Sequence, residues 1–225
     1  MDAVIFFDIR NFSAHRQLLG LTKSAKPLSV LVIDLLEKAV MLGNSLVPRF
    51  GIEKLPLLNH TGDGFVIVLQ GGRACLAALT FASEFREFAE VKLATYQSRF
   101  DKCHEDAEPE TKLPSKLDYG MGVHCGSVTP LKYKSFRGTR MIFLGSAVNI
   151  ASRVEGCTKD HPHAVLCTEQ VYSHARADLE PALRPQFKKC FSSLGKHNLR
   201  GLHGPVTLFV CEPRLQNWLR LNLRR

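Results

Sequence analysis

The chain has no apolar run approaching the roughly 20 residues that a membrane-spanning helix needs. Its first residues also lack the basic start and the cleavage site of a secretory signal. These two absences favour a cytoplasmic protein without stable membrane insertion. The chain has 7 cysteines, which is an odd number, and no two of them form a CxxC motif. This distribution argues against a zinc site or a disulfide framework and favours reduced thiols.

Charge is plentiful but is not concentrated. Lys and Arg total 30 against 21 Asp and Glu, which gives a formal net charge of +9. No block of five or more like charges occurs, so an unstructured nucleic-acid-binding arm is not expected. Dispersed basic charge fits a polyphosphate substrate at least as well as a nucleic acid. With 225 residues, 45% of them hydrophobic, and no internal repeat, the chain is expected to form one globular domain.

Hydrophobic periodicity predicts the element order β-α-β-β-α-β. A short apolar stretch at 3–9 predicts a buried strand, and residues 27–51 predict a helix that is apolar on nearly all sides. Two strands around a Gly-rich turn are expected at 53–69, followed by a long amphipathic helix at 74–100. This order predicts an α+β fold with a ferredoxin-like, palm-like antiparallel sheet and helices packed on one face.

Further elements are expected in the rest of the chain. They are a surface loop at 101–116, a strand at 116–128, a solvated basic hairpin at 131–140, a strand, turn and helix at 141–156, a strand and short helix at 163–175, and a final strand pair at 190–213.

Two acids stand at strand ends that the predicted sheet makes neighbours. Asp8 ends the first strand, in FFDIRNFS, and Asp63 lies at the hairpin tip, in HTGDGFV. Asp-Gly is a favoured hairpin dipeptide, so Asp63 taken alone is explained by the turn. However, an acid at the end of an apolar run is costly without a partner, and two converging acids repel each other unless a cation lies between them. Mg²⁺ or Mn²⁺ serving a nucleoside triphosphate would meet both needs.

Five segments resemble, in order, the signature segments of class III nucleotidyl cyclases. They are FFDIRNFS, TGDGFVIV, YGMGVHCGSV, GSAVNIASRVEG and NLRGLHGPVTLFV. Together they extend from Phe6 to Val210. The resemblance implies a catalytic domain at 1–212, with 213–225 as a basic C-terminal tail whose leucines have helical spacing. It also implies a head-to-tail homodimer in which each active site is shared between the two chains.

The resemblance implies roles for individual residues. Asp8 and Asp63 match two metal-binding acids, with the Ile9 carbonyl as a further ligand, for two Mn²⁺ or Mg²⁺ ions in each site. Asn149 and Arg153, supplied by the partner chain, match the catalytic pair that orients the ribose and neutralises charge at the α-phosphate. Their spacing of four residues places both on one face of a helix.

Phosphate contacts are implied at two further places. Arg200 matches a basic position near the β- and γ-phosphates, and Lys196 is the rival for that role. The backbone amides from Arg10 to Ser13, including that of Phe12, could hold phosphate where a turn enters a helix.

The two positions that read the base depart from the purine cyclases of the family. The position four residues before the second metal acid, Lys in adenylyl and Glu in guanylyl cyclases, is Asn59. The position seven residues before the catalytic Asn, Asp or Thr in adenylyl and Cys in guanylyl cyclases, is Ile142. Asn can pair with uracil or with cytosine, and a branched apolar side chain suits a smaller base. The chain thus resembles the bacterial pyrimidine cyclases of Pycsar anti-phage systems, and we favour UTP as its substrate.

Four alternatives remain open at this point. CTP could replace UTP, and an adenylate or guanylate cyclase could read its base through His60 or Lys54. A diguanylate cyclase should carry a GG(D/E)EF hairpin, which HTGDGFV is not. A non-catalytic cyclase-homology regulator usually lacks a metal acid or the Asn/Arg pair, and this chain keeps all four. The cyclic nucleotide is expected to be read by a separate effector, and the activator to be a partner or a phage component.

Overall fold

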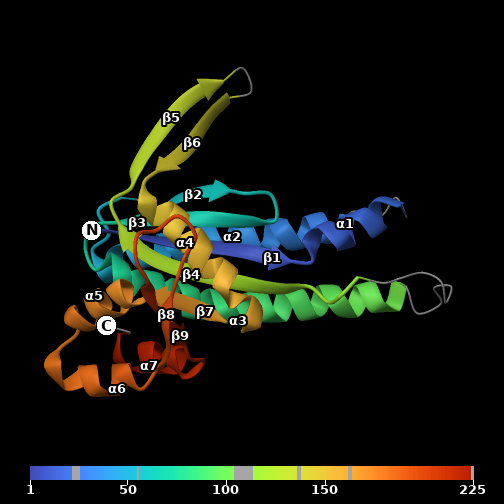
Figure 1. The fold of residues 1–225 in the computed structure, drawn as a ribbon. Helices are drawn as coiled ribbons and strands as arrows, with labels where there is room; N and C mark the ends of the chain where they lie inside the picture. The colour runs from blue at the N-terminus through green and yellow to red at the C-terminus, as the bar shows by residue number, and fades with distance from the viewer. Residues whose placement is uncertain (22–25, 55, 104–113, 136–137, 162–163, 224–225) are drawn as a thin grey trace.

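The computed structural model describes residues 1–21, 26–54, 56–103, 114–135, 138–161 and 164–223. Within these ranges, the main sheet has seven strands in the order β2-β3-β1-β4-β7-β9-β8 (Figure 1). Every neighbouring pair is antiparallel except β4 and β7, which are parallel. The order β2-β3-β1-β4 confirms the predicted ferredoxin-like α+β arrangement.

The element bounds follow the predicted periodicity closely. The sheet strands are β1 (Asp2–Arg10), β2 (Leu57–His60), β3 (Gly64–Gln70), β4 (Asp118–Gly126), β7 (Val165–Thr168), β8 (Phe191–His197) and β9 (Val206–Cys211). The helices are α1 (Phe12–Leu21), α2 (Lys26–Phe50), α3 (Ala74–Cys103), α4 (Ser146–Gly156), α5 (Glu169–Ala177), α6 (Arg184–Lys188) and α7 (Arg214–Asn222), with 3-10 turns at Cys157–Asp160 and Pro181–Leu183. Most of the loop predicted at 101–116 lies outside the described residues.

Helices cover both faces of the sheet, so the expectation of a single covered face was wrong. Phe7 and its alternate neighbours on β1 pack in the cluster that contains α2 and α3, whereas Val4 packs with Ala151 of α4 on the opposite face. Gly122 makes the second contact possible, because a methyl group there would overlap the backbone of α4. The hydrophobic periodicity of the sequence predicts the layer formed by α2 and α3. The layer formed by α4 is revealed only by the close approach of its backbone to Gly122.

A two-stranded arm, β5 (Thr129–Ser135) and β6 (Gly138–Leu144), projects from the body of the domain (Figure 1). Leu131 lies opposite Ile142 in the arm, and both side chains are at least 39% exposed. Tyr133 and Leu144 are exposed on the same face. The hairpin predicted around 131–140 is therefore longer than expected, and one of its faces is apolar and open in the single chain.

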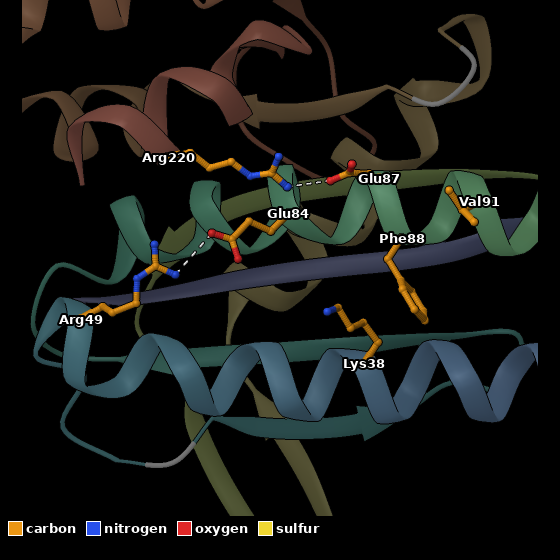
Figure 2. Close-up of a pocket in the computed structure, with 7 residues that line it drawn as sticks. All are labelled: Lys38, Arg49, Glu84, Glu87, Phe88, Val91 and Arg220. Atoms are coloured by element: carbon orange, nitrogen blue, oxygen red, sulfur yellow. Dashed lines mark hydrogen bonds and ion pairs between the residues drawn. The ribbon is translucent and has the colours of Figure 1, made fainter. Parts of the chain in front are cut away.

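The C-terminal segment is a docked helix. Leu215, Trp218 and Leu219 of α7 are buried, and Arg220 donates a hydrogen bond to Glu87 of α3 at 2.7 Å (Figure 2). The groove beside this contact, about 500 Å³ in volume, is lined by Lys38, Arg49, Glu84, Glu87, Phe88, Val91 and Arg220. None of the predicted site residues lines it. In the described part of the chain, no helix combines the length and apolarity that a membrane span requires.

Truncating the docked face of α7 should destabilise the domain. Leu219 is 1% exposed, so Leu219→Ala should lower the free energy of unfolding by about 2–4 kcal/mol through lost burial and a residual cavity. Leu221 is 84% exposed, and Leu221→Ala is the matched control, with an expected change within about 0.5 kcal/mol. Urea denaturation measures both values. Equal stabilities for the two variants would show that α7 does not support the fold.

His124 on β4 should make the fold sensitive to acid. Its Nδ1 lies 2.9 Å from Thr168 Oγ1, and burial lowers its pKa to about 4. The unfolded pKa is higher, near 6.5, so protons bind preferentially to the unfolded chain, and stability is lost as pH falls from 6.5 through 4. His124→Gln should reduce the loss in free energy of unfolding between pH 7 and pH 4 by about 3 kcal/mol. Urea denaturation at pH 7 and pH 4 tests this, and an unchanged pH dependence in the variant would contradict it.

Candidate active site

Asp8 lies at the point where β1 leaves the centre of the sheet. Strand register places it opposite Gly64 of β3 on one side and Gly120 of β4 on the other. A side chain at Gly64 would begin 3.0 Å from Asp8 Oδ1, so Gly64 leaves the carboxylate open on that side, whereas the space at Gly120 is taken by other side chains. Asp63 immediately precedes Gly64, and its carboxylate is within hydrogen-bonding reach of Asp8. The predicted convergence of the two acids is present.

The electrostatics of this pair fit a divalent cation. The pKa of Asp8 is raised to about 7, mainly by burial and then by the negative charges of Asp63 and Glu155. The positive charge of Arg10 lowers the pKa of Asp8 but is a smaller influence than burial and the two acids, so it opposes the shift only in part. Two acids that repel each other in a half-buried site are the donor set that Mg²⁺ or Mn²⁺ stabilises. Among the described residues, no three His, Cys, Asp or Glu side chains gather to hold a metal.

The prediction that Asp8 ends the first strand was wrong, because β1 continues to Arg10. The chain then turns at Asn11 to begin α1. Asn11 adopts a φ of 63°, a left-handed conformation that Asn tolerates better than most residues. Its Nδ2 donates to the carbonyl of Lys116 at 2.8 Å, which fixes the turn. Phe12 then starts α1, and the first backbone N–H groups of a helix have no partner within the helix. The predicted phosphate-binding amides therefore lie directly after Asp8 in the chain.

The predicted catalytic pair lies on α4. Asn149 is exposed and Arg153 is half-buried one helical turn further on. The guanidinium of Arg153 lies against Gly201, where an added Cβ would be 3.2 Å from Nη2. Gly201 directly follows Arg200, so α4 and the loop that carries Arg200 are neighbours. Lys196 is exposed on β8.

The predicted residues fall into two groups in one chain. Within the part of the chain that the structure describes, no hydrogen bond or ion pair links Asn149 or Arg153 to Asp8 or Asp63. The acids lie at the end of β1 and the tip of the β2–β3 hairpin, and the catalytic pair lies near the β8–β9 loop.

The two base-reading positions lie on different elements. Asn59 on β2 is half-buried and lies opposite Val66, so its side chain is on the same sheet face as that of Asp8. Ile142 is on the apolar face of the β5–β6 arm. Asn59 therefore lies on the hairpin that carries Asp63 and on the sheet face of Asp8, whereas Ile142 lies on the strand that leads into α4.

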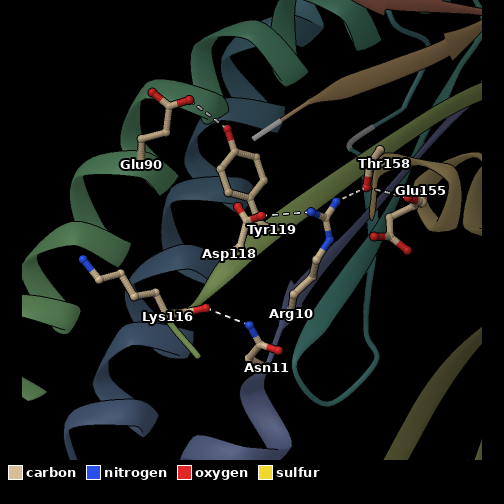
Figure 3. A network of polar contacts seen from close by, with 8 residues as sticks. All are labelled: Arg10, Asn11, Glu90, Lys116, Asp118, Tyr119, Glu155 and Thr158. Atoms are coloured by element: carbon tan, nitrogen blue, oxygen red, sulfur yellow. Dashed lines mark hydrogen bonds and ion pairs between the residues drawn. The ribbon is translucent and has the colours of Figure 1, made fainter. Parts of the chain in front are cut away.

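A buried polar network next to Asp8 was missed by sequence reasoning (Figure 3). Arg10 binds Asp118 across the strand pair, and its other nitrogen donates to Thr158. Glu155 lies beside them, close to Asp8. These residues are up to 148 positions apart, and only the register of β1 against β4 brings them together. No local spacing in the sequence indicates them.

Comparisons with known proteins agree with this geometry. The family model described as "Adenylate and Guanylate cyclase catalytic domain" matches residues 2–212. The adenylyl cyclase CyaB from P. aeruginosa is 18% identical, with a TM-score of 0.65 over 93% of this chain and 92% of that chain. The guanylate cyclase domain of RhGC from Catenaria anguillulae, solved with GTP, is 17% identical, with a TM-score of 0.61 over 93% and 94%.

A third similar structure is the non-canonical dimeric guanylyl cyclase domain of the RhoGC fusion protein from the aquatic fungus Blastocladiella emersonii. It is 17% identical, with a TM-score of 0.59 over 93% of this chain and 94% of that chain. No curated protein sequence matches this chain. Because the family model covers nearly the whole sequence, the chain belongs to the class III adenylate and guanylate cyclase family and is a nucleotide cyclase catalytic domain.

Proposed function

We propose that this chain is a pyrimidine nucleotide cyclase that converts UTP to 3′,5′-cyclic UMP and pyrophosphate. The observation that carries the proposal is the pair Asn59 and Ile142, which replaces both purine-reading side chains in a chain that keeps the two metal acids and the catalytic Asn/Arg pair. Asn59 supports it further, because it shares a sheet face with Asp8 and so can lie near a substrate bound there.

The reaction joins two atoms of one substrate. The ribose 3′-oxygen forms a bond to the α-phosphorus, the bond from that phosphorus to the bridging oxygen of pyrophosphate breaks, and the 3′-hydroxyl proton passes to solvent. Asp8, Asp63 and the Ile9 carbonyl would hold two Mn²⁺ or Mg²⁺ ions. When bound, such ions favour ionisation of the hydroxyl and stabilise the leaving group. The backbone at Phe12 and the side chain of Arg200 or Lys196 would bind the phosphates.

A head-to-tail homodimer would complete the site. Asn149 and Arg153 of one chain would orient the ribose and stabilise charge on the α-phosphate bound to the acids of the other. Two observations support this arrangement: among the described residues no hydrogen bond or ion pair links the pair to the acids, and the apolar face around Leu131 on the arm is open.

The alternative substrates differ in how they would be read. The Asn59 amide can present a donor and an acceptor in either order, so CTP remains the second candidate. A purine would need His60 or Lys54, both of which are exposed. A non-catalytic regulator is disfavoured because the metal acids and the Asn/Arg pair are all present.

The biological setting follows from the substrate. We infer a bacterial anti-phage role of the Pycsar type, in which a cytoplasmic cyclase makes cyclic UMP and a separate effector reads it. Residues 1–212 would form the catalytic domain, and α7 within 213–225 would support it by packing against α3.

A competition assay tests the choice of base. The protein receives equimolar ATP, GTP, CTP and UTP with Mn²⁺, and the cyclic products are quantified by mass. We expect cyclic UMP to predominate. Asn59→Lys combined with Ile142→Asp should raise the share of cyclic AMP by about tenfold or more, because matched hydrogen-bond groups discriminate strongly. An unchanged product ratio would show that these positions do not read the base.

A further inference from the structure

Arg10 is placed where it would be expected to neutralise Asp8. The two residues are two apart on β1, so their side chains start on the same face of the strand. Arg and carboxylate groups form strong charge-assisted hydrogen bonds when they meet. A bond of this kind would occupy the oxygens that a metal ion needs. The guanidinium nevertheless points elsewhere.

Two anchors engage the Arg10 guanidinium in hydrogen bonds to residues other than the acid pair. Nη1 donates to Asp118 Oδ2 at 2.9 Å, and Nη2 donates to Thr158 Oγ1 (Figure 3). Asp118 lies directly opposite Arg10 in the β1–β4 register, so the strand pairing itself sets the first anchor. Both partners of this ion pair are largely buried, with side chains 15% and 20% exposed.

The second anchor is itself fixed in orientation. Thr158 is fully buried, and its hydroxyl donates to the carbonyl of Glu155 at 2.6 Å. Because its proton is used in that bond, its oxygen is free to accept from Arg10. Gly120 provides the space, since a methyl group there would overlap Thr158 Oγ1 and Glu155 Oε1. Gly120 also lies directly opposite Asp8, so Thr158 and Asp8 both lie beside the space left by its missing side chain.

We propose that Arg10 is a positioning residue whose anchoring by Asp118 and Thr158 keeps the Asp8 carboxylate available to a divalent cation. This inference rests on the proposed metal-dependent function. Arg10 Nε has no hydrogen-bond partner among the described residues, so a released guanidinium would have a donor to offer Asp8. Loosening either anchor would free Arg10, whose charge already acts on Asp8, to hydrogen-bond that carboxylate and compete with the metal.

The test is Mn²⁺ binding by the full-length chain without nucleotide, measured from the free-ion EPR signal. Thr158→Val removes one anchor and keeps both volume and net charge. We expect it to weaken Mn²⁺ binding by roughly tenfold, the effect of one charge-assisted hydrogen bond to Asp8. In an Arg10→Gln background the same substitution should leave Mn²⁺ affinity unchanged, because there is no guanidinium to release. Asp118→Asn, which releases the other nitrogen, serves if Thr158→Val does not fold.

The outcomes separate this inference from the proposed function. Wild-type affinity in a folded Thr158→Val or Asp118→Asn variant would overturn the role of the anchors and leave the metal site intact. An equal loss in the presence and absence of Arg10 would also overturn it, because the effect would then be structural. If the wild-type chain bound no Mn²⁺, the proposed metal site would fall, and this inference with it.

Discussion

Asp8→Asn is expected to abolish formation of the cyclic nucleotide while the protein stays folded. Asn has nearly the shape of Asp but lacks the charge that would hold a divalent ion against Asp63. Loss of metal-assisted activation of the hydroxyl and leaving group should reduce the rate by roughly 10³-fold or more. Chromatography and mass detection of the product measure the loss.

The same substitution should stabilise the metal-free protein above neutral pH. Burial and neighbouring acids raise the pKa of Asp8 to about 7, so its favourable contribution is present at low pH and is lost as pH rises through 7. Asn stays neutral and should increase the free energy of unfolding at pH 8 by roughly 1–2 kcal/mol. Asp2→Asn, at the other end of β1, is the matched control and should keep cyclase activity. An active Asp8→Asn variant would refute the metal role.

Arg153→Ala is expected to reduce the rate by about 10²–10³-fold, because it removes positive charge from the transition state.

A second test asks whether activity returns when two different inactive chains are mixed. In a head-to-tail dimer of Asp8→Asn with Arg153→Ala, one site combines both substitutions and the other keeps both native residues. Random mixing should therefore restore about a quarter of wild-type activity, since half of the dimers are mixed and each has one intact site.

The control for complementation uses two substitutions in the same half-site. A mixture of Asp8→Asn and Asp63→Asn chains leaves every site with a damaged acid pair and should stay inactive. Recovered cyclase activity in this control would show that mixing restores activity by a route other than the pairing of intact half-sites. No recovery in the Asp8→Asn and Arg153→Ala mixture, with mixed dimers shown to form, would contradict the shared active site.

The convergence of Asp8 and Asp63 could be predicted from the sequence because it depends on local patterns. A short apolar stretch defines β1, the Gly-flanked turn defines the β2–β3 hairpin, and the ferredoxin-like order then brings the two ends together. The metal, base and phosphate roles rest on resemblance to the cyclase family, and the experiments described here test them.

The second helical layer and the Arg10 network could not be predicted in the same way. Both depend on missing side chains at Gly120 and Gly122, which let α4 and Thr158 approach β4. A glycine in a strand indicates a close approach but does not identify the approaching group. The open apolar face of the arm was missed for another reason: the 131–140 segment is basic, which predicts a hairpin with solvent on both faces.

Product identification tests the central claim most directly. The purified chain is incubated with Mn²⁺ and each of ATP, GTP, CTP and UTP separately, with the Asp8→Asn chain as the blank. We predict 3′,5′-cyclic UMP from UTP and no cyclic product from the blank. Cyclic AMP or cyclic GMP as the main product would contradict the pyrimidine assignment, and no cyclic product from any of the four would contradict the assignment of this chain as an active cyclase.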